Sequence, residues 1–456
     1  MPRPRRVAFQ TLGCPKNTVD SDAFASILRV AGYECITQPH RADILIVNTC
    51  GFLDDAKVES VEVLLEAIRW KLAKPDRQVL AMGCLTQRDR FEVAENIPEL
   101  DGVFGIGEWS QMLEALGTNP VAIDAASFAV SVNAGSAGPG SAYLRISDGC
   151  SHACAFCSIP QMRGLYRSEP IEVLVGEAEQ LVSNGVKEII LIGQETTGYG
   201  VDLYRERRLA ELCQRLSELD GLEWIRLLYA HPPSTPPALL EHLARIPKFI
   251  PYIDYPIEHA ADAMLKRMNR RTTAKRMRDA ISAFRAAMPN ACVRTTVLVG
   301  FPGETDEEFD RLYEFMEEVR FERAGVFVYS PQEHTVGSEL PDRVEEGIAL
   351  DRLDRLMQLQ RTICLEKHNN LIGHTIPVLI ERSTQGASWG RGIWDAPDID
   401  GRVRVDGVHT PGQIIHAIVS KAYAYRLDAK PVANAVGDYE QRELCGSFGL
   451  PVLSRP

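Results

Sequence analysis

The feature that most constrains the fold is a repeated alternation of short apolar runs and helical stretches in the middle of the chain. Six runs have the length and composition of buried strands: 142–146, 188–192, 224–228, 251–255, 293–299 and 324–329. Helical patterns follow most of them, for example 170–183 and 305–319, with Pro170 expected at the first helical position and Thr305 at the N-cap. This alternation predicts a parallel sheet, and six units predict a partial (β/α)6 barrel with its site at the carboxyl ends of the strands.

The flanking regions differ from this central part. Residues 1–130 carry predicted strands at 6–10, 43–47 and 78–82 with helices at 21–31 and 56–73 between them, which indicates a parallel α/β domain. A Gly/Ala/Ser-rich linker is expected at 131–140, and the central region runs over 141–368, closed by a long helix at 344–369. Residues 369–436 are β-rich at 375–381, 401–405 and 413–425 and predict a small β-barrel, followed by a tail at 437–456. The expected fold class is therefore a multidomain α/β protein.

Composition excludes several classes of protein. No run of 18 apolar residues occurs and no signal peptide is recognisable, so we expect a cytoplasmic protein that does not span a membrane. Eleven cysteines in such a chain favour metal or redox chemistry over disulfides. A formal net charge of −12 argues against a long nucleic-acid groove and allows a basic protein partner.

Three closely spaced cysteines, Cys150, Cys154 and Cys157, form a C-x3-C-x2-C motif. Three thiolates on a four-iron cluster leave one iron open to bind and activate a small molecule. The alternative is a zinc knuckle completed by His152 or a distant ligand. The spacing, with Phe156 before the third cysteine, resembles the signature of the radical S-adenosylmethionine (SAM) superfamily, in which the open iron chelates the cofactor.

A second set, Cys14, Cys50 and Cys84, is widely spaced, but each cysteine directly follows a predicted strand. Because the carboxyl ends of parallel strands share one edge of a sheet, the three can converge on a second cluster. The alternative is three buried cysteines that act as small hydrophobic residues.

Polar and glycine residues follow the strands of the central region and are candidates for binding the cofactor. Glu195 is a candidate acceptor for an ammonium group, and glycines such as Gly300 permit close approach of a flat ligand. Arg294 lies within a strand, where it serves either as an ion-pair partner or as a carboxylate clamp. The full set of candidate cofactor contacts is Glu195, Thr197, Glu258, Arg294 and Gly300. The basic stretch 267–278 is interpreted as a solvated helical face.

Several motifs together resemble the methylthiotransferase family, and within it the RimO type. They are Leu12-Gly-Cys-Pro-Lys-Asn17, the Cys150–Cys157 motif, Gln194-Glu-Thr-Thr197, Tyr255-Pro-Ile-Glu-His259 and Val299-Gly-Phe-Pro-Gly-Glu-Thr305. The resemblance implies an N-terminal methylthiotransferase domain, a radical SAM core and a C-terminal TRAM barrel. The chain departs from the family pattern at Glu169, Glu258 and His334, which affects the cofactor pocket and none of the six cysteines.

The resemblance also implies an activity: methylthiolation of the β-carbon of an aspartate in ribosomal protein uS12, with two [4Fe-4S] clusters and S-adenosylmethionine as cofactors. It makes transfer RNA an unlikely substrate, and it leaves the electron donor, the sulfur source and the oligomeric state open. The alternatives are a transfer-RNA methylthiotransferase of the MiaB type and a non-catalytic RNA-binding protein with structural zinc. The residues from Trp394 to Asp400 are expected to help dock the ribosomal protein.

Overall fold

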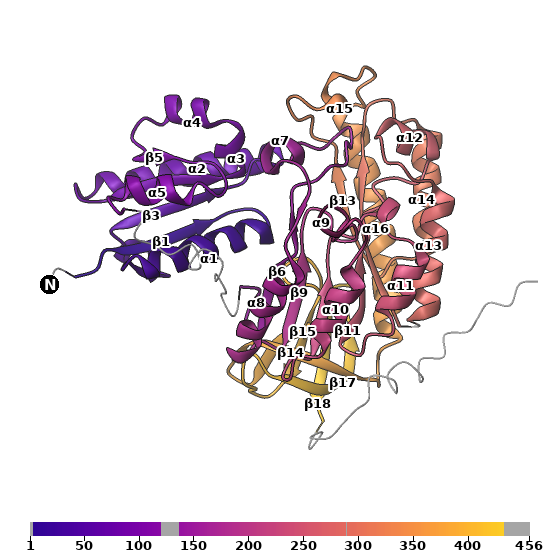
Figure 1. Ribbon diagram of the computed structural model, residues 1–456. Helices are drawn as coiled ribbons and strands as arrows, with labels where there is room; N and C mark the ends of the chain where they lie inside the picture. The colour runs from indigo at the N-terminus through magenta and orange to yellow at the C-terminus, as the bar shows by residue number, and fades with distance from the viewer. Residues whose placement is uncertain (1–2, 120–135, 289, 433–456) are drawn as a thin grey trace, which may run out of the picture.

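The computed structural model describes residues 3–119, 136–288 and 290–432, which form two parallel sheets, a closed barrel and their helices (Figure 1). The predicted tail at 437–456 and the first half of the predicted linker lie outside these residues. Within this described part of the chain, none of the helices combines the length and the apolar character that crossing a membrane requires.

The N-terminal part is a five-stranded parallel sheet in the order β2-β1-β3-β4-β5. Its elements are β1 (Arg6–Thr11), α1 (Pro15–Val30), β2 (Glu34–Ile36), η1 (Pro39–Arg41), β3 (Ile44–Thr49), α2 (Asp54–Leu72), β4 (Gln78–Gly83), α3 (Cys84–Arg88), α4 (Arg90–Asn96), β5 (Gly102–Val103) and α5 (Trp109–Ala115). The central strand β3 is buried along its whole length, as expected of a parallel strand covered on both faces. Helices α1 and α5 pack on one face, and α2, α3 and α4 pack on the other.

The central part is a six-stranded parallel sheet whose strands lie in sequence order, from β6 to β13. Its elements are β6 (Ser141–Arg145), β7 (Ser147–Asp148), α7 (Ile159–Arg163), β8 (Arg167–Ser168), α8 (Ile171–Ser183), β9 (Glu188–Ile192), α9 (Val201–Tyr204), α10 (Leu209–Ser217), β10 (Trp224–Leu227), η3 (Pro232–Ser234), α11 (Pro237–Leu243), β11 (Phe249–Asp254), α12 (Asp262–Arg267), α13 (Ala274–Ala287), β12 (Cys292–Val299), α14 (Asp306–Val319), β13 (Arg323–Val328), α15 (Val336–Glu339) and α16 (Glu346–Asn369). The six predicted strands are all present, and the predicted partial barrel is confirmed.

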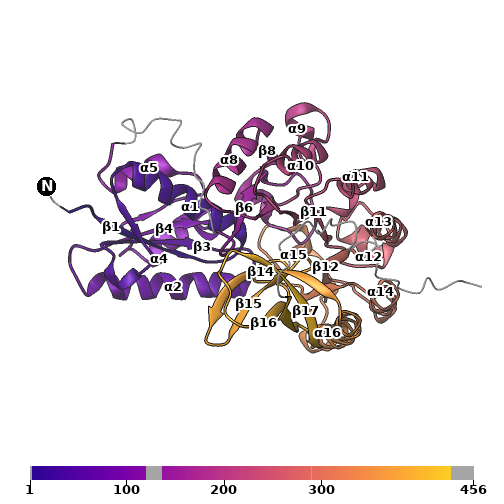
Figure 2. The same cartoon turned by 90° about the horizontal axis from the view of Figure 1, so that it is seen from below.

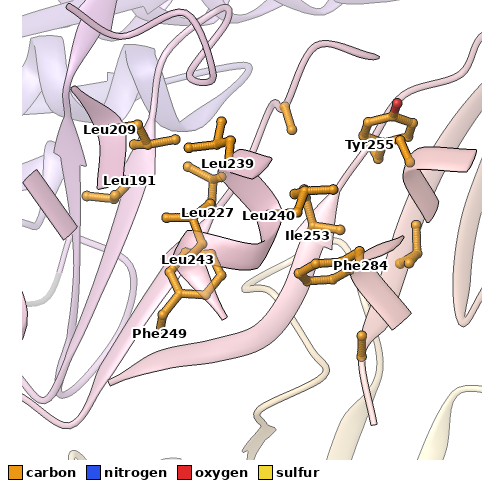
Figure 3. Packing of buried hydrophobic residues seen from close by; sticks show 14 of the residues in the cluster. Leu191, Leu209, Leu227, Leu239, Leu240, Leu243, Phe249, Ile253, Tyr255 and Phe284 are labelled. Atoms are coloured by element: carbon orange, nitrogen blue, oxygen red, sulfur yellow. The ribbon is translucent and has the colours of Figure 1, made fainter. Parts of the chain in front are cut away.

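The outer face of this sheet carries the largest hydrophobic core of the molecule. Figure 3 shows Leu191, Leu227 and Ile253 of the strands packed with side chains of the covering helices, among them Leu209, Leu240 and Phe284. Thr305 caps α14 in a complete capping box with Glu308, as the sequence predicts. Pro170 was expected inside α8 and instead occupies its N-cap position with extended backbone, one residue before the helix.

The C-terminal part is a closed five-stranded barrel in the order β14-β15-β16-β18-β17, which confirms the predicted small barrel. Its strands are β14 (Thr375–Thr384), β15 (Ala387–Gly392), β16 (Arg402–Asp406), β17 (Ile414–Ala422) and β18 (Arg426–Pro431). Strands β15 and β18 were not predicted from the sequence. In β15 a Cβ on Gly390 would lie 2.0 Å from the Leu379 carbonyl oxygen of β14. The close contact of these two strands therefore requires glycine, which is otherwise rare in strands.

The barrel and the N-terminal sheet contact opposite ends of the central sheet (Figures 1 and 2). Arg391 of β15 pairs with Glu188, the first residue of β9, so the barrel lies against the amino ends of the central strands. Lys16 of α1 lies over the Tyr229 ring, just beyond the carboxyl end of β10, so the N-terminal sheet meets the carboxyl ends. The edge where a site is expected in such folds therefore faces the N-terminal part.

The loop between β15 and β16 packs inside the partial barrel, which contradicts its expected role in docking. Ile393 and Ala396 belong to the same buried cluster as Trp224 and Tyr252 of the inner face. Asp395 pairs with Arg323 at 2.7 Å, and the Asp400 side chain is 2 % exposed. Only Asp398 and Ile399 of the expected docking stretch are exposed. Asp395 and Asp400 of this loop therefore serve the contact between the C-terminal and central parts of the chain.

Candidate functional site

The three central cysteines lie in the loop between β7 and α7, directly beyond the carboxyl end of β6. All three are free thiols of intermediate exposure, and the Cys157 N–H donates to the Cys154 carbonyl at 3.1 Å, which folds the motif into a turn. Gly149 precedes the motif with φ +72°, and a Cβ there would lie 2.3 Å from the Leu165 carbonyl oxygen, so only glycine fits. The loop is thus held in shape at its base while its thiols stay accessible.

Two donors approach the thiols of this loop. The His152 backbone N–H lies 3.5 Å from Cys150 Sγ, and Arg270 Nη1 lies 3.6 Å from Cys154 Sγ. Burial raises the pKa of Cys150 to about 11 and of Cys157 to about 12 in the metal-free chain. Binding to iron requires the thiolate form, so these donors and a bound cluster would together hold the thiols deprotonated.

Arg270 is a site residue that the sequence analysis missed. It belongs to the stretch 267–278, which was interpreted as a solvated face, yet it is only 6 % exposed. Its guanidinium contacts Cys154, donates to the Pro256 carbonyl at 2.6 Å and lies 3.9 Å from Glu258. The interpretation was wrong for this residue because α12 ends at Arg267 and α13 begins at Ala274, so Arg270 is in a connecting turn and points inward.

Glu195 lies on the loop after β9, within reach of the cysteine motif. Its Oε1 accepts hydrogen bonds from Thr197 Oγ1 at 2.6 Å and from the Gly198 N–H at 2.7 Å. Its Oε2 lies 3.8 Å from His152 Nε2 of the cysteine loop. Thr197 is fully buried and also accepts from the His231 N–H at 3.1 Å, so it positions Glu195 and the next strand-end loop together.

Two histidines from different loops stack beside Glu195. The rings of His152 and His231 lie 3.7 Å apart at an angle of 21°. Burial and the nearby Arg270 lower the pKa of His231 to about 2, so this ring is neutral. The sequence analysis considered His152 only as a zinc ligand. In the structure its ring stacks on His231 and lies close to Glu195.

Glu258 and Gly300 follow β11 and β12 at the same end of the sheet. Glu258 has φ +64°, and burial raises the pKa of its carboxyl group, although Arg270 opposes the shift. Gly300 has φ +75°, and a Cβ there would lie 2.7 Å from the Ala349 Cβ of α16. Packing against α16 therefore accounts for this glycine without a ligand.

Arg294 lies deeper in the sheet than the other candidates. Its Nη1 donates to Asp254 at 2.9 Å, and its Nε lies 3.5 Å from Asp400 of the C-terminal part. These contacts support the ion-pair interpretation of Arg294, because two carboxylates compensate its positive charge. Arg226 likewise pairs with Glu188 at 2.7 Å.

The second set of cysteines follows three adjacent strands of the N-terminal sheet, β1, β3 and β4. Cys14 is the N-cap residue of α1, Cys50 directly follows β3 and Cys84 begins α3. Helix α1 was predicted to begin at 21 and begins at Pro15, because proline is well suited to the first helical position.

One side chain joins the loops that carry these cysteines. Asn17, fully buried, donates from Nδ2 to the carbonyls of Leu12 at 2.9 Å and Thr49 at 3.1 Å. Its Oδ1 lies 3.5 Å from Cys84 Sγ. A Cβ on Gly13 would come within 2.8 Å of Cys50 Sγ, so the first two loops are in direct contact. The three strand ends thus form one compact edge.

Arg163 connects this edge to the central part. It lies at the end of α7, six residues after Cys157, and its side chain is 1 % exposed. Its Nη2 donates to Asn17 Oδ1 at 2.8 Å and Asp20 at 2.7 Å, and it lies 3.6 Å from Cys84 Sγ. The helix that follows one cysteine motif therefore contacts a cysteine of the other.

Each donor set offers three free thiols, and a four-iron cluster can be held by three thiolates. Within the described residues, no three His, Cys, Asp or Glu side chains are placed to hold one metal ion. A zinc ion needs four ligands within about 2.3 Å of one point. In a four-iron cluster each cysteine binds a different iron, so three thiols on a shaped loop or sheet edge suit it better.

Family models match all three parts of the chain. Residues 6–105 match the uncharacterized protein family UPF0004, residues 144–316 the radical SAM superfamily and residues 372–432 the TRAM domain. Radical SAM membership implies a [4Fe-4S] cluster and S-adenosylmethionine as cofactors.

Solved structures share the fold at low sequence identity. The radical SAM methyltransferase TsrM from Kitasatospora setae has a TM-score of 0.54 at 14% identity, covering 73% of this chain and 77% of TsrM. The cobalamin-dependent radical enzyme OxsB has a TM-score of 0.52 at 14% identity, covering 80% of this chain and 56% of OxsB. These likenesses concern the fold alone.

Relatives of known name match nearly the whole chain. The ribosomal protein uS12 methylthiotransferase RimO of Thermoanaerobacter sp. (strain X514) is 40% identical over 433 residues, which is 93% of this chain and 99% of the relative. The protein of the same name from Synechocystis sp. is 40% identical over 438 residues, covering 92% and 96%. With the three-part fold and the two sets of cysteines, these matches place the chain in the RimO family of radical SAM methylthiotransferases.

Proposed function

We propose that this protein methylthiolates the β-carbon of an aspartate in ribosomal protein uS12, with S-adenosylmethionine and two [4Fe-4S] clusters. The observation that carries the proposal is the 40% identity over 93% of the chain to proteins named for this activity. A transfer-RNA substrate, the first alternative, is less well supported because the relatives carry the ribosomal-protein name and the chain has a net charge of −12.

In this proposal Cys150, Cys154 and Cys157 hold one cluster at the carboxyl end of the central sheet. When bound, S-adenosylmethionine and this cluster would supply a radical that removes an unactivated hydrogen, and a second S-adenosylmethionine would supply the methyl group. Oε2 of Glu195 is the carboxylate oxygen left for the ammonium group of S-adenosylmethionine, because Oε1 already accepts two hydrogen bonds. Thr197 keeps this carboxylate in place.

Cys14, Cys50 and Cys84 hold the second cluster in this proposal. Arg163 supports the assignment, since it fixes the edge with these cysteines against the helix that follows the first motif. Burial raises the pKa of Cys84 to about 12, and the positive charge of Arg163 beside this thiol opposes part of that shift and favours the thiolate. The two cluster sites are then connected through Arg163 at the contact between the N-terminal and central parts.

The decisive experiment is a reaction with purified components under anaerobic conditions. The reconstituted protein, a reductant, S-adenosylmethionine and either small ribosomal subunits or isopentenylated transfer RNA are incubated separately, and the products are analysed by mass spectrometry. We expect a methylthio group on a uS12 aspartate and none on the transfer RNA. Modified transfer RNA with unmodified uS12 would establish the alternative.

A further inference from the structure

Lys16 is a buried cation that forms no ion pair with a carboxylate in the described part of the chain. The residue is 5 % exposed, and among the residues described no carboxylate lies within 4.0 Å of its Nζ. Its Nζ lies 3.0 Å from the centre of the Tyr229 ring. A cation–π contact offsets only part of the cost of removing an ammonium group from water, so the site favours an additional anion.

The carboxylates nearest in the fold are already paired. Asp254 accepts from Arg294 at 2.9 Å and from the Tyr229 N–H at 3.1 Å. Asp148 lies 3.5 Å from Arg163 and 3.7 Å from Arg145. Neither forms an ion pair with Lys16. The other negative group close to it is the Cys14 thiolate, so no carboxylate of the described residues competes with a ligand for the ammonium group.

The ring under Lys16 is held by a strained backbone. Tyr229 has φ +60°, a conformation that is costly for a bulky residue and persists only where the surroundings enforce it. Its N–H donates to Asp254, and its carbonyl accepts from the Thr196 N–H at 3.1 Å and from Thr196 Oγ1 at 3.2 Å. These bonds fix the ring at the carboxyl end of β10, beside the loop that carries Glu195.

Lys16 therefore lies between the two candidate cluster sites. It is two residues after Cys14 in the chain, at the start of α1, and it reaches across to the central part. Figure 1 shows α1 beside β6, whose carboxyl end leads into the other cysteine motif. The ammonium group is thus placed where the segment with Cys14 contacts the strand ends of the central part.

We propose that Lys16 binds the side-chain carboxylate of the substrate aspartate, with Tyr229 as the support for its ammonium group. The inference rests on the proposed function. The β-carbon of aspartate is bonded directly to that carboxylate, so an ion pair with Lys16 would hold the reacting carbon between the two cysteine sets. Lys16 would thereby select an acidic side chain over its neutral amide.

The test compares binding of two uS12 loop peptides, one with the target aspartate and one with asparagine in its place. Fluorescence anisotropy with the reconstituted protein measures both dissociation constants for the wild type, Lys16→Met, Lys16→Arg and the exposed control Lys74→Met. We expect the wild type and K74M to bind the aspartate peptide about 10- to 100-fold more tightly, as a charge-assisted hydrogen bond allows. K16M should bind both peptides alike, and K16R should retain a preference for aspartate.

Iron content and S-adenosylmethionine cleavage without peptide show whether each variant is intact. An intact K16M that keeps the wild-type preference for aspartate overturns the inference and leaves the proposed function in place. If K16M does not load iron, Lys16→Gln takes its place, and an intact K16Q that keeps the wild-type preference for aspartate overturns the inference in the same way. A wild type that neither binds nor modifies uS12 removes the proposed function, and the inference with it.

Discussion

The two carboxylate oxygens of Glu195, at the carboxyl end of β9, have different surroundings. One carboxylate oxygen ties its own loop together through Thr197 and Gly198, and the other faces the cysteine motif near His152. A Cβ on Gly198 would lie 2.3 Å from Glu195 Oε2, so the close packing of the loop on this carboxylate requires glycine. In the proposed function the second oxygen binds a cationic ligand without rearrangement of the loop.

The first prediction concerns this carboxylate. Glu195→Gln keeps the shape of the side chain and removes its charge, so it should weaken S-adenosylmethionine binding by about 1.5–3 kcal/mol. Isothermal titration calorimetry with the reconstituted protein measures the change. Glu206→Gln, on an exposed residue paired with Arg208 in the segment after α9, should leave the dissociation constant unchanged. Equal affinities of wild type and E195Q would assign Glu195 a purely structural role.

At the level of elements, the β15–β16 loop joins the C-terminal barrel to the central sheet by buried charges. Asp395 accepts from both Nε and Nη2 of Arg323, at 3.2 and 2.7 Å, and from the Gly401 N–H at 3.1 Å. Burial by itself would raise the pKa of Asp395, but Arg323 lowers it below its usual range. The loop therefore depends on matched charges, and removing one partner leaves the other buried without compensation.

The second prediction compares two aspartates of this loop. Asp395→Asn should destabilise the protein by about 3–5 kcal/mol, because Arg323 then lacks its carboxylate. Asp398→Asn, on the exposed part of the same loop, should change stability by no more than about 0.5 kcal/mol. Denaturant unfolding and hydrogen exchange in β13 and β15 report the difference. Similar effects of the two substitutions would contradict the role given to the buried pair.

The third prediction uses Glu188, which lies between Arg226 and Arg391. Burial would raise its pKa, yet the two guanidinium groups lower it from 4.5 to about 2. Because the folded-state pKa is depressed, its stabilising contribution is complete above pH 4.5 and is lost as the pH falls toward 2. The stability difference between the wild type and Glu188→Gln should therefore shrink as the pH is lowered from 6 to 3, measured by denaturant unfolding of the metal-free proteins. A constant difference over this range would show that Glu188 is not ionised.

At the scale of the whole molecule, the central sheet is covered at both ends by other parts of the chain. The C-terminal barrel contacts the amino ends of its strands, and the N-terminal sheet contacts the carboxyl ends through Lys16 and Arg163. Figure 1 shows α3 beside α7, and Arg163 of α7 lies 3.6 Å from Cys84 Sγ, so the segments that carry the two cysteine sets meet although they are far apart in sequence. Shielding from solvent suits radical chemistry, which bulk water and oxygen would interrupt.

The fourth prediction concerns the metal content of the whole protein. Anaerobic reconstitution should give about eight irons per chain, corresponding to two four-iron clusters. Cys50→Ala should lose about half of the iron and still cleave S-adenosylmethionine, whereas Cys154→Ala should lose the other half together with cleavage. Cys213→Ala, at a cysteine buried in the hydrophobic core, should keep the full content. Full iron in both C50A and C154A would refute the assignment of ligands.

The sequence by itself determined the architecture and the family of this protein. The alternation of apolar runs and helices gave the six-stranded sheet, and the spacing of Cys150, Cys154 and Cys157 indicated the cluster, because both depend on residues near in sequence. It also placed Cys14, Cys50 and Cys84 at one sheet edge, since parallel strands end on the same side. Strands β2, β5, β7, β8, β15 and β18 escaped prediction because pairing with other segments, not local propensity, makes them strands.

Only the tertiary structure decided which charges belong to the site and which hold the molecule together. Asp395 and Asp400 looked like part of a docking surface, Arg270 like part of a solvated face and Arg294 like an ion-pair partner or a clamp. The fold buries these aspartates inside the partial barrel, directs Arg270 to a cysteine and pairs Arg294 with two carboxylates. The physical reason is that the role of a charged side chain depends on its burial and its partners, and here those partners come from segments distant in the sequence.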